Sequence, residues 1–177
     1  PPYTHVVNPA YEAILATFKK NNDQYKRLVK NWRTFIPKNL DADLSAAQAK
    51  AFETIDCMDC GNCCRALGPR VKPRDIPPLA KSLGMKPGRF EEEYLRLDED
   101  GDMIFRTRPC PFVGEDNACF VYHDRPWACR AYPHLDQRNQ MARLNEVMAD
   151  AEICPAVALA LESMLPKENP LERPKRK

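Results

Sequence analysis

Glycine is scarce in this chain, with only six among 177 residues and none adjacent to another. The sequence therefore lacks the glycine-rich loops that hold a cofactor phosphate, both the G-x-G-x-x-G pattern and the P-loop. It also lacks the G-x-S-x-G of serine hydrolases and the C-x3-C-x2-C of radical enzymes. These absences argue against the common nucleotide-dependent and acyl-transfer enzyme classes.

The chain also lacks a strong charge of one sign and a long apolar run. The formal net charge is +2 at pH 7, which gives no general attraction for nucleic acid. No stretch of 18 apolar residues occurs, so we expect no membrane span. The opening residues, PPYTHVVNPAYEAIL, show neither the charged nor the continuous apolar region of a signal peptide. The expected location is therefore cytoplasmic.

Cysteine is absent from residues 1–55, where helical patterns dominate. Asn8 followed by Pro9 is typical of a helix start, and apolar residues then recur at helical spacing over 11–36. The polar stretch KKNNDQ interrupts this pattern. One long helix with a polar middle and two helices separated at that point both fit.

A further helix is predicted from about Leu44 to Ile55, with its start capped by Asp41, Asp43 or Ser45. We expect the whole of 1–55 to form a helical arm, through which a protein partner could bind.

Beyond the arm, the elements become short, because 17 prolines fix many corners of the backbone. Residues 74–97 predict two short helices, and DEDGDMIFR predicts a tight turn leading into a strand. A knuckle or short hairpin is expected around 114–117, and a last helix is expected to open at Cys154 and Pro155. The residues of 74–97 expected to face the core are Leu79, Leu83, Met85, Phe90, Tyr94 and Leu97.

These patterns predict a mainly α fold with irregular, metal-stapled loops and short β-hairpin pieces. The expected organisation is a helical arm at 1–55, a small cysteine-cluster domain at 56–166 and a charged, disordered tail at 167–177.

Four of the eight cysteines lie within CMDCGNCC, residues 57–64. C-x2-C spacing lets two thiolates reach one metal ion around a tight turn. In a reducing compartment, clustered cysteines bind metals more often than they form disulfides. The predicted metal ligands are Cys57, Cys60, Cys63, Cys64, Cys110, Cys119, Cys129 and Cys154. The adjacent pair Cys63 and Cys64 suggests a junction between two ligand sets that the later cysteines complete, with the membership of each set left open.

Arginine is concentrated where the cysteines are. Residues 56–134 hold nine arginines, whereas the residues before them hold two. Arginine donates several N–H groups and keeps its charge, so it suits the neighbourhood of a thiolate-bound metal. The four arginines within four residues of a cysteine are Arg65, Arg108, Arg125 and Arg130, which we expect to surround the centre. His123 and His134 flank Cys129, but eight cysteines already suffice for two four-ligand sites.

The chain resembles the family of zinc- or iron-chelating proteins named for its CxxCxxCC cluster, the YkgJ-like group. The resemblance rests on CMDCGNCC, on KPRDIPPLAKSLGM at 72–85, on CPFVGEDNACFVYHDRPWACRAYP at 110–133 and on Cys154. It covers about residues 56–156. The resemblance implies a metal or iron–sulfur site; a related domain occurs in a flagellin lysine methylase. It implies no particular reaction for a small chain of this kind.

Two cofactors fit this cysteine pattern. Zinc would occupy closed sites of four thiolates, whereas a 4Fe-4S cluster would use four cysteines and leave the rest for other roles. The Cys-Pro pairs are similar to those of bacterial ferredoxins and favour the iron–sulfur cluster. The expected function is metal binding with a structural or redox role beside a partner. A metalloenzyme that modifies a protein or RNA side chain, and a protein that delivers zinc or iron, are the alternatives.

Overall fold

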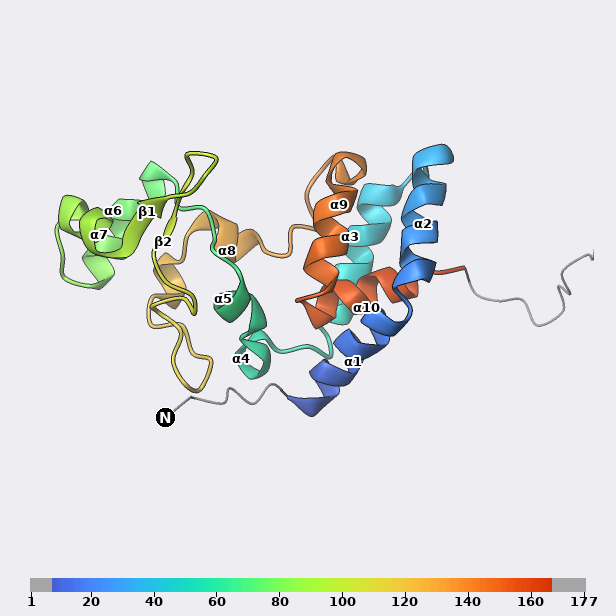
Figure 1. The fold of residues 1–177 in the computed structure, drawn as a ribbon, viewed down its shortest axis with the longest axis horizontal. Helices are drawn as coiled ribbons and strands as arrows, with labels where there is room; N and C mark the ends of the chain where they lie inside the picture. The colour runs from blue at the N-terminus through green and yellow to red at the C-terminus, as the bar shows by residue number, and fades with distance from the viewer. Residues whose placement is uncertain (1–7, 167–177) are drawn as a thin grey trace, which may run out of the picture.

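The chain forms two groups of secondary-structure elements with short helices between them (Figure 1). This arrangement comes from a computed structural model, which describes residues 8–166, and 58% of the structure is helical. The ten α-helices within those residues are α1 (Pro9–Lys20), α2 (Asn22–Thr34), α3 (Leu40–Ala51), α4 (Cys57–Cys60), α5 (Asn62–Ala66), α6 (Ile76–Ser82), α7 (Pro87–Tyr94), α8 (Trp127–Ala131), α9 (Gln140–Ala151) and α10 (Pro155–Ser163). The mainly α fold with a short hairpin is confirmed.

Helices α1, α2, α3, α9 and α10 form the first group, here named the helical lobe. Helix α10 packs against α1, α3 and α9. Its sequence PAVALALES is apolar on nearly every face, which is typical of a helix enclosed by others. Leu44, Leu144 and Leu161 are fully buried in this core. Helix α9 was not predicted from the sequence, although Leu144, Val147 and Ala151 follow helical spacing on its buried face.

Residues 9–34 form two helices, which decides between the two alternatives for 11–36. Asn8 caps α1 with its side chain, which accepts a hydrogen bond from the Ala10 N–H at 3.0 Å, and Pro9 is the first helical residue, as predicted. The break falls at Asn21, between α1 and α2. Phe18 stacks on Tyr25 across this break, with ring centroids 4.5 Å apart, so the two helices meet through an apolar contact.

Helix α3 begins and ends four residues earlier than predicted, and its predicted caps are wrong. It starts at Leu40, which is buried, whereas Asn39 provides no side-chain cap. The carboxylate of Asp41 instead accepts hydrogen bonds from the backbone N–H groups of Asn139 and Gln140, at 2.8 and 2.9 Å. Asp41 therefore stabilises the start of α9 rather than the start of its own helix.

The second group, here named the hairpin lobe, contains α6, α7 and the strands β1 (Leu95–Leu97) and β2 (Met103–Phe105). The strands pair antiparallel, with Leu95 opposite Phe105. Phe90 is fully buried here, and Phe105 meets Phe112 edge to face at 5.3 Å between ring centroids. The prediction that Leu97 faces the core is wrong, because the strand runs past the core and leaves Leu97 63% exposed.

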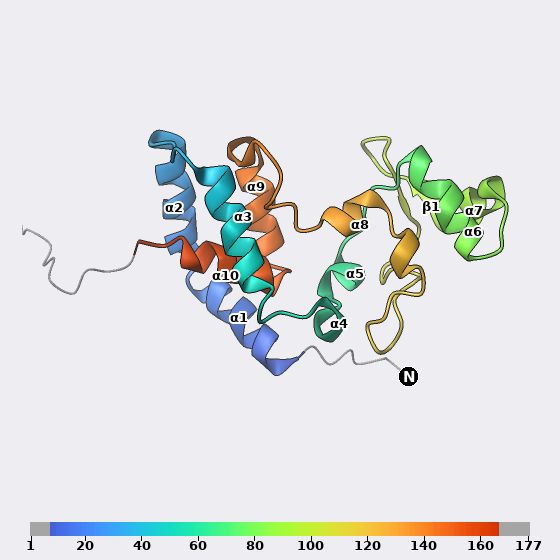
Figure 2. The same cartoon turned by 180° about the vertical axis from the view of Figure 1, so that it is seen from behind.

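Short helices α4, α5 and α8 lie between the two lobes, as both sides of the molecule show (Figures 1 and 2). Two 3₁₀ helices, η1 (Pro73–Asp75) and η2 (Tyr122–Asp124), connect to this region. In the part of the chain that the structure describes, no helix is both long and apolar enough to cross a membrane.

The core of the helical lobe contains residues from both sides of position 55. Leu44 of α3 and Leu161 of α10 belong to the same cluster of buried residues. The division of the chain into 1–55, 56–166 and 167–177 stays a prediction, and the tail expected to be disordered lies outside the described residues. Helices from the predicted arm thus share a core with the chain's last helices, which flank the cysteine segments.

Candidate metal centre

The CMDCGNCC segment folds into two successive short helices, α4 and α5, joined at Gly61. The carboxylate of Asp56 accepts a hydrogen bond from the Met58 N–H at 2.8 Å and thereby caps α4. The Asp56 N–H donates to the Tyr11 hydroxyl at 3.0 Å, which fixes the segment to α1. Helix α4 thus carries Cys57 and Cys60, and α5 carries Cys63 and Cys64.

Gly61 has a φ of +59°, in the left-handed region that favours glycine. A Cβ at this position would overlap the side chain of Asn117. That side chain accepts a hydrogen bond from Arg65 at 2.9 Å, so it is held in place. Glycine is therefore required here for two reasons, its backbone angle and the close approach of the 114–117 knuckle.

The 110–119 segment returns to α5 through backbone hydrogen bonds. The Cys110 N–H donates to the Cys64 carbonyl at 2.8 Å. Arg65 also donates to the Gly114 carbonyl at 3.1 Å, next to its bond with Asn117. The predicted knuckle is confirmed, because Gly114 and Ala118 are hydrogen bonded at 2.8 Å. Cys110 and Cys64, 46 positions apart in the sequence, thus lie on touching segments.

Cys154 and Cys129 reach the same region by different routes. Asn62 donates its side-chain amide to the Ile153 carbonyl at 3.3 Å, which places the start of α10 beside α5. Cys129 lies on α8, and the first residue of that helix, Trp127, donates its N–H to the buried Asp75 carboxylate at 3.2 Å. All the cysteine-bearing segments therefore converge between the two lobes.

Several sulfurs already accept backbone hydrogen bonds of the kind that metal-binding knuckles provide. Phe112 and Val113 donate their N–H groups to the Cys110 sulfur, and Val121 donates to Cys119. Asn62 donates to Cys60. At the start of α10, the N–H groups of Val157 and Ala156 donate to the Cys154 sulfur. Each of these bonds favours the thiolate form, which is the form that binds a metal.

Burial keeps most of the eight thiols protonated in the absence of a metal. It raises the pKa of Cys110 to about 11 and that of Cys154 to about 12. It also raises the pKa of Cys129 to about 12. Three neighbouring sulfurs raise the pKa of Cys129 further, and they belong to Cys110, Cys64 and Cys119. For Cys154, the sulfurs that raise the pKa belong to Cys57 and Cys60.

The adjacent thiols of Cys63 and Cys64 lie 4.0 Å apart and share a hydrogen bond. This bond raises the pKa of Cys63 and lowers the pKa of Cys64 to about 7. The guanidinium groups of Arg125 and Arg65 lower the Cys64 pKa further, because they stabilise its negative charge. Cys64 is therefore the sulfur best prepared to lose its proton first.

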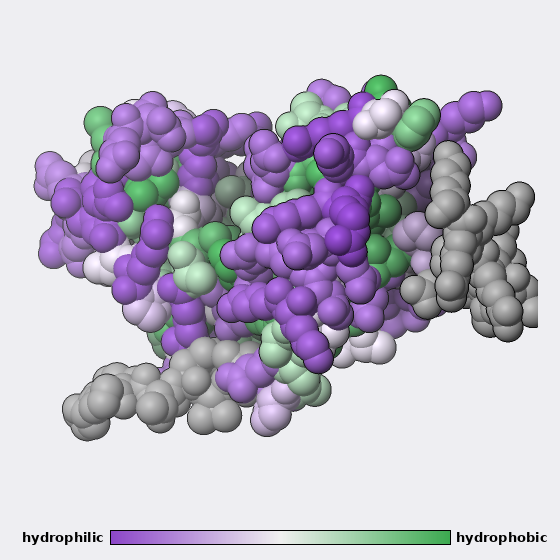
Figure 3. Space-filling model, turned by 45° about the vertical axis from the view of Figure 1, so that its right-hand side comes forward, coloured by the Kyte–Doolittle hydropathy of each residue, from purple (hydrophilic) through white to green (hydrophobic). Residues whose placement is uncertain are grey.

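A cavity of about 840 Å³ opens beside the cysteines, between the two lobes. Six of the eight cysteines line it, namely Cys57, Cys63, Cys64, Cys110, Cys119 and Cys129. Cys60 and Cys154, the two most buried, lie behind this lining. Aromatic and apolar side chains line it too, whereas the outer face drawn in Figure 3 is mostly hydrophilic with small hydrophobic patches.

The four arginines predicted to surround the centre occupy different positions. Arg65 is half-buried and holds the knuckle, and its Nε–H is buried without a hydrogen-bond partner. Arg125 lies over the Tyr122 ring at 3.6 Å from its centroid and donates to the Tyr122 carbonyl at 2.8 Å. Arg108 and Arg130 are exposed at the edge of the cavity. Arg65 and Arg125 are thus the two arginines close enough to influence the sulfurs.

His123 and His134, which flank Cys129 in the sequence, also differ in their position relative to the cavity. His134 lines the cavity and packs against Trp127 at 5.3 Å between ring centroids. Burial lowers its pKa, so the ring stays neutral. His123 is exposed, meets Tyr122 edge to face and is outside the cavity lining.

Sequence reasoning missed the side of the cavity that the helical lobe provides. Tyr132, Arg143 and Asp150 line it, and the last two come from the unpredicted helix α9. It also missed Lys72, whose ammonium lies 5.3 Å from the centroid of the Trp127 ring at the cavity edge. None of these residues belongs to a metal-ligand spacing, so the cysteine pattern alone did not identify them.

The residues present suit a thiophilic metal, although their side chains do not converge on a single point. Within residues 8–166, no three cysteine, histidine or carboxylate side chains are already arranged to hold an ion. The eight cysteines remain as thiols rather than disulfides. The buried Nε–H of Arg65 beside Cys64 is an unused donor that a metal-bound thiolate or sulfide would satisfy. The thiols must move and lose their protons to become ligands.

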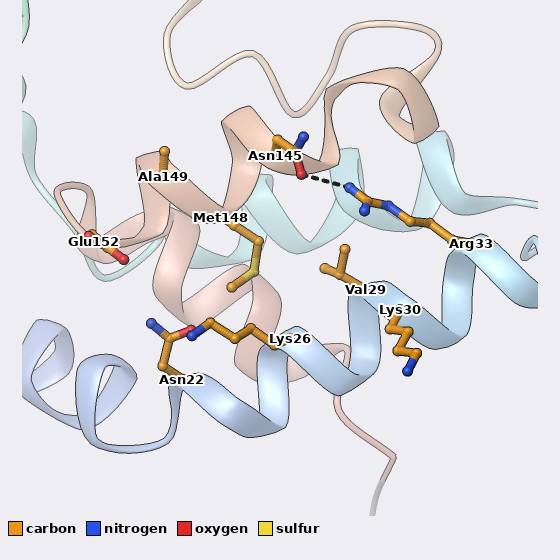
Figure 4. A pocket seen from close by; sticks show the side chains of 9 residues that line it. All are labelled: Asn22, Lys26, Val29, Lys30, Arg33, Asn145, Met148, Ala149 and Glu152. Atoms are coloured by element: carbon orange, nitrogen blue, oxygen red, sulfur yellow. Dashed lines mark hydrogen bonds between the residues drawn. The ribbon is translucent and has the colours of Figure 1, made fainter.

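A second hollow, of about 420 Å³, lies between α2 and α9 (Figure 4). Lys26, Lys30 and Arg33 line its α2 side, and Arg33 donates to the Asn145 side chain at 2.7 Å. Among the described residues that line this hollow, none is a cysteine or a histidine. The described residues of this hollow therefore offer neither a thiolate nor an imidazole ligand to a metal.

Comparison with known families supports the cysteine region as the metal-binding part of the chain. A family model named CxxCxxCC, described as "Putative zinc- or iron-chelating domain", matches residues 56–155, more than half of the chain. No curated protein and no solved structure matches the chain. The matched range begins just before α4 and ends at the first residue of α10, so it contains all eight cysteines.

Proposed function

Because the chain belongs to the CxxCxxCC family of zinc- or iron-chelating domains, we propose that its cysteines hold an iron–sulfur cluster, zinc, or both. The metal has a structural or redox role, exercised together with a protein partner. Family membership supports the chelation of zinc or iron, and the arrangement of the cysteines supports a polythiolate centre. A metal bound between the lobes would join the four chain segments that carry the cysteines.

One observation carries this proposal: six cysteines from three separate segments line a single cavity. Buried cysteines normally act as small apolar side chains packed in a core. Here Cys57, on α4, is exposed, and Cys64 has a pKa lowered to about 7 by its bond with Cys63 and by two arginines. Sulfurs that are accessible and grouped around a cavity are suited to binding a metal rather than to filling a core.

The test is to purify the full chain without oxygen and to measure its iron, acid-labile sulfide and zinc together with its visible spectrum. A brown protein with a broad visible absorbance and equal iron and sulfide supports a cluster. A colourless protein with stoichiometric zinc supports zinc centres. A folded protein that contains neither metal, even after incubation with each under reducing conditions, contradicts the proposal.

The cavity supports a second candidate, a metalloenzyme that acts on a side chain of a protein or RNA. Its volume of about 840 Å³ falls within the usual range of ligand-binding sites, roughly 300–1,000 Å³. Trp127 and Tyr122 are exposed there, which would suit an aromatic or aliphatic group of a ligand. A spectral change of the metal-loaded protein on addition of a substrate peptide or oligonucleotide would favour this candidate. A spectrum that no added ligand changes would favour the structural or redox role.

A further inference from the structure

We propose that the eight cysteines form two separate four-thiolate centres, divided between the adjacent residues Cys63 and Cys64. The first centre, here named set A, consists of Cys57, Cys60, Cys63 and Cys154. The second, here named set B, consists of Cys64, Cys110, Cys119 and Cys129. This assignment rests on the proposed function, since it specifies which sulfurs share a metal.

Set A is brought together by the contact between α5 and the start of α10. Asn62, next to Cys63, donates to the carbonyl of Ile153, next to Cys154. Cys57 and Cys60 lie at the two ends of α4, and the Gly61 N–H returns to the Cys57 carbonyl at 2.9 Å. A single tight turn therefore carries two sulfurs of the set, and α10 brings the fourth.

Set B is brought together on the opposite side of α5, by the chain that returns from the hairpin lobe. The Cys110 N–H donates to the carbonyl of Cys64 itself. Cys119 lies next to this segment, because it forms a backbone bridge with Val113, and the Phe120 N–H donates to Phe112 at 2.9 Å. Cys129, on α8, lines the same cavity as the other three cysteines and is the fourth member.

The division falls within α5 because of helix geometry. Consecutive residues of a helix point about 100° apart, so Cys63 and Cys64 present their sulfurs to different neighbours. Their separation of 4.0 Å fits two sites that meet at a common boundary, and it also fits two ligands of one ion. The surrounding contacts favour two sites. Cys63 follows Asn62, whose side chain donates to the Ile153 carbonyl at the start of α10. The backbone carbonyl of Cys64 instead accepts a hydrogen bond from the Cys110 N–H.

Arginine side chains lie on the side of set B. Arg65 donates to the Gly114 carbonyl at 3.1 Å, in the knuckle between Cys110 and Cys119. Cys64 is assigned to set B because its carbonyl accepts a hydrogen bond from the Cys110 N–H at 2.8 Å. Arg65 and Arg125 lie beside Cys64, so set B has the cations that compensate an excess of thiolate charge.

The experiment compares four variants of the full chain, Cys63→Ser, Cys154→Ser, Cys64→Ser and Cys129→Ser, each purified without oxygen. We expect Cys63→Ser and Cys154→Ser to lose the same metal centre and to keep the other. Cys64→Ser and Cys129→Ser should lose the second centre and keep the first. The double variant Cys63→Ser/Cys154→Ser should lose no more metal than either single variant, whereas Cys63→Ser/Cys129→Ser should lose both centres.

A measurement on the wild-type protein tests the same division if some of the variants fail to fold. A chelator is added slowly, the cysteines that become reactive are alkylated, and each is identified by peptide mass spectrometry. We expect the four cysteines of set A to become reactive in one phase and the four of set B in another. One common phase for all eight, or a phase that groups Cys63 with Cys129, overturns the division while leaving the proposed function intact. A wild-type protein without metal overturns both.

Discussion

The buried carboxylate of Asp75 accepts a hydrogen bond from the backbone N–H of Trp127 at 3.2 Å. Its other oxygen accepts the Lys72 N–H at 3.0 Å. One side chain at the end of η1 thus fixes the start of α8, the helix that carries Cys129. This buried side chain therefore supports the helix that carries Cys129.

We expect Asp75→Ala to lower the free energy of unfolding by about 1–3 kcal/mol, because two backbone N–H groups would lose a charged acceptor. The same variant should weaken metal binding, since α8 would no longer be fixed. Chemical denaturation and metal titration of the purified variant measure both effects. Asp75→Asn is the matched control, because it keeps one acceptor oxygen and should lose less. Equal stability of wild type and Asp75→Ala would show that the Trp127 contact contributes nothing.

Gly61→Ala should be among the most damaging single changes near the cysteines. A left-handed φ at alanine costs about 1–2 kcal/mol. The new Cβ would also displace the Asn117 side chain from its bond with Arg65. We expect a loss of metal content together with the loss of stability, measured by elemental analysis and by thermal unfolding.

Gly84→Ala separates the two causes of this effect. Gly84 has a φ of +65°, similar to that of Gly61, but no atom lies near the position of its Cβ. It should therefore show the backbone strain alone and keep its full metal content. If both glycine variants bind metal equally, the close approach of Asn117 to Gly61 is unimportant for the centre.

The sequence predicted those features that depend on short-range patterns. The Asn8 cap, the helix opening at Pro155 and the knuckle at 114–117 each follow from a few neighbouring residues. The grouping of the four cysteines of 57–64 on two short turns also follows from C-x2-C spacing, whereas spacing alone did not tie Cys119 or Cys154 to them. The polar break at Asn21 allowed two interpretations, one helix or two. The sequence could not decide between them, because the packing of Phe18 on Tyr25 across the break is a tertiary contact.

Features that depend on contacts between distant segments could not be read in the same way. Asp41 was predicted to cap its own helix, but its carboxylate bonds to residues 98 and 99 positions away. The assignment of Cys154 to one set depends on an amide contact over 91 positions, from Asn62 to Ile153. Such contacts cannot be predicted from the order of residues, because an Asn or Asp side chain offers the same hydrogen-bonding atoms to a local or a distant partner.

Asp150 should make stability depend on pH. Burial raises the pKa of its carboxyl from an ordinary 3.8 to about 6. Between these values the folded state binds more protons than the unfolded state, so stability falls as the pH rises from about 4 to about 6. We expect Asp150→Asn to be more stable than wild type at pH 7 and to lack this fall. Chemical denaturation at several pH values measures it, and Glu152→Gln, an exposed change on the same turn, is the control. An unchanged pH profile in Asp150→Asn would mean that the carboxyl ionises normally.

Removal of the metal should unfold the region between the lobes while leaving the helical lobe folded. Helices α4, α5 and α8 have four, five and five residues, too few to be stable without support. The helical lobe has a core of its own, in which Leu144 and Leu161 are fully buried. After chelation, hydrogen exchange should become fast over 57–66 and 127–131 but stay slow in α2 and α10. Leu144→Ala is the reverse control, because its cavity should cost about 2–5 kcal/mol in the helical lobe. Exchange that accelerates equally in both regions after chelation would show that the metal stabilises the whole chain as one cooperative unit.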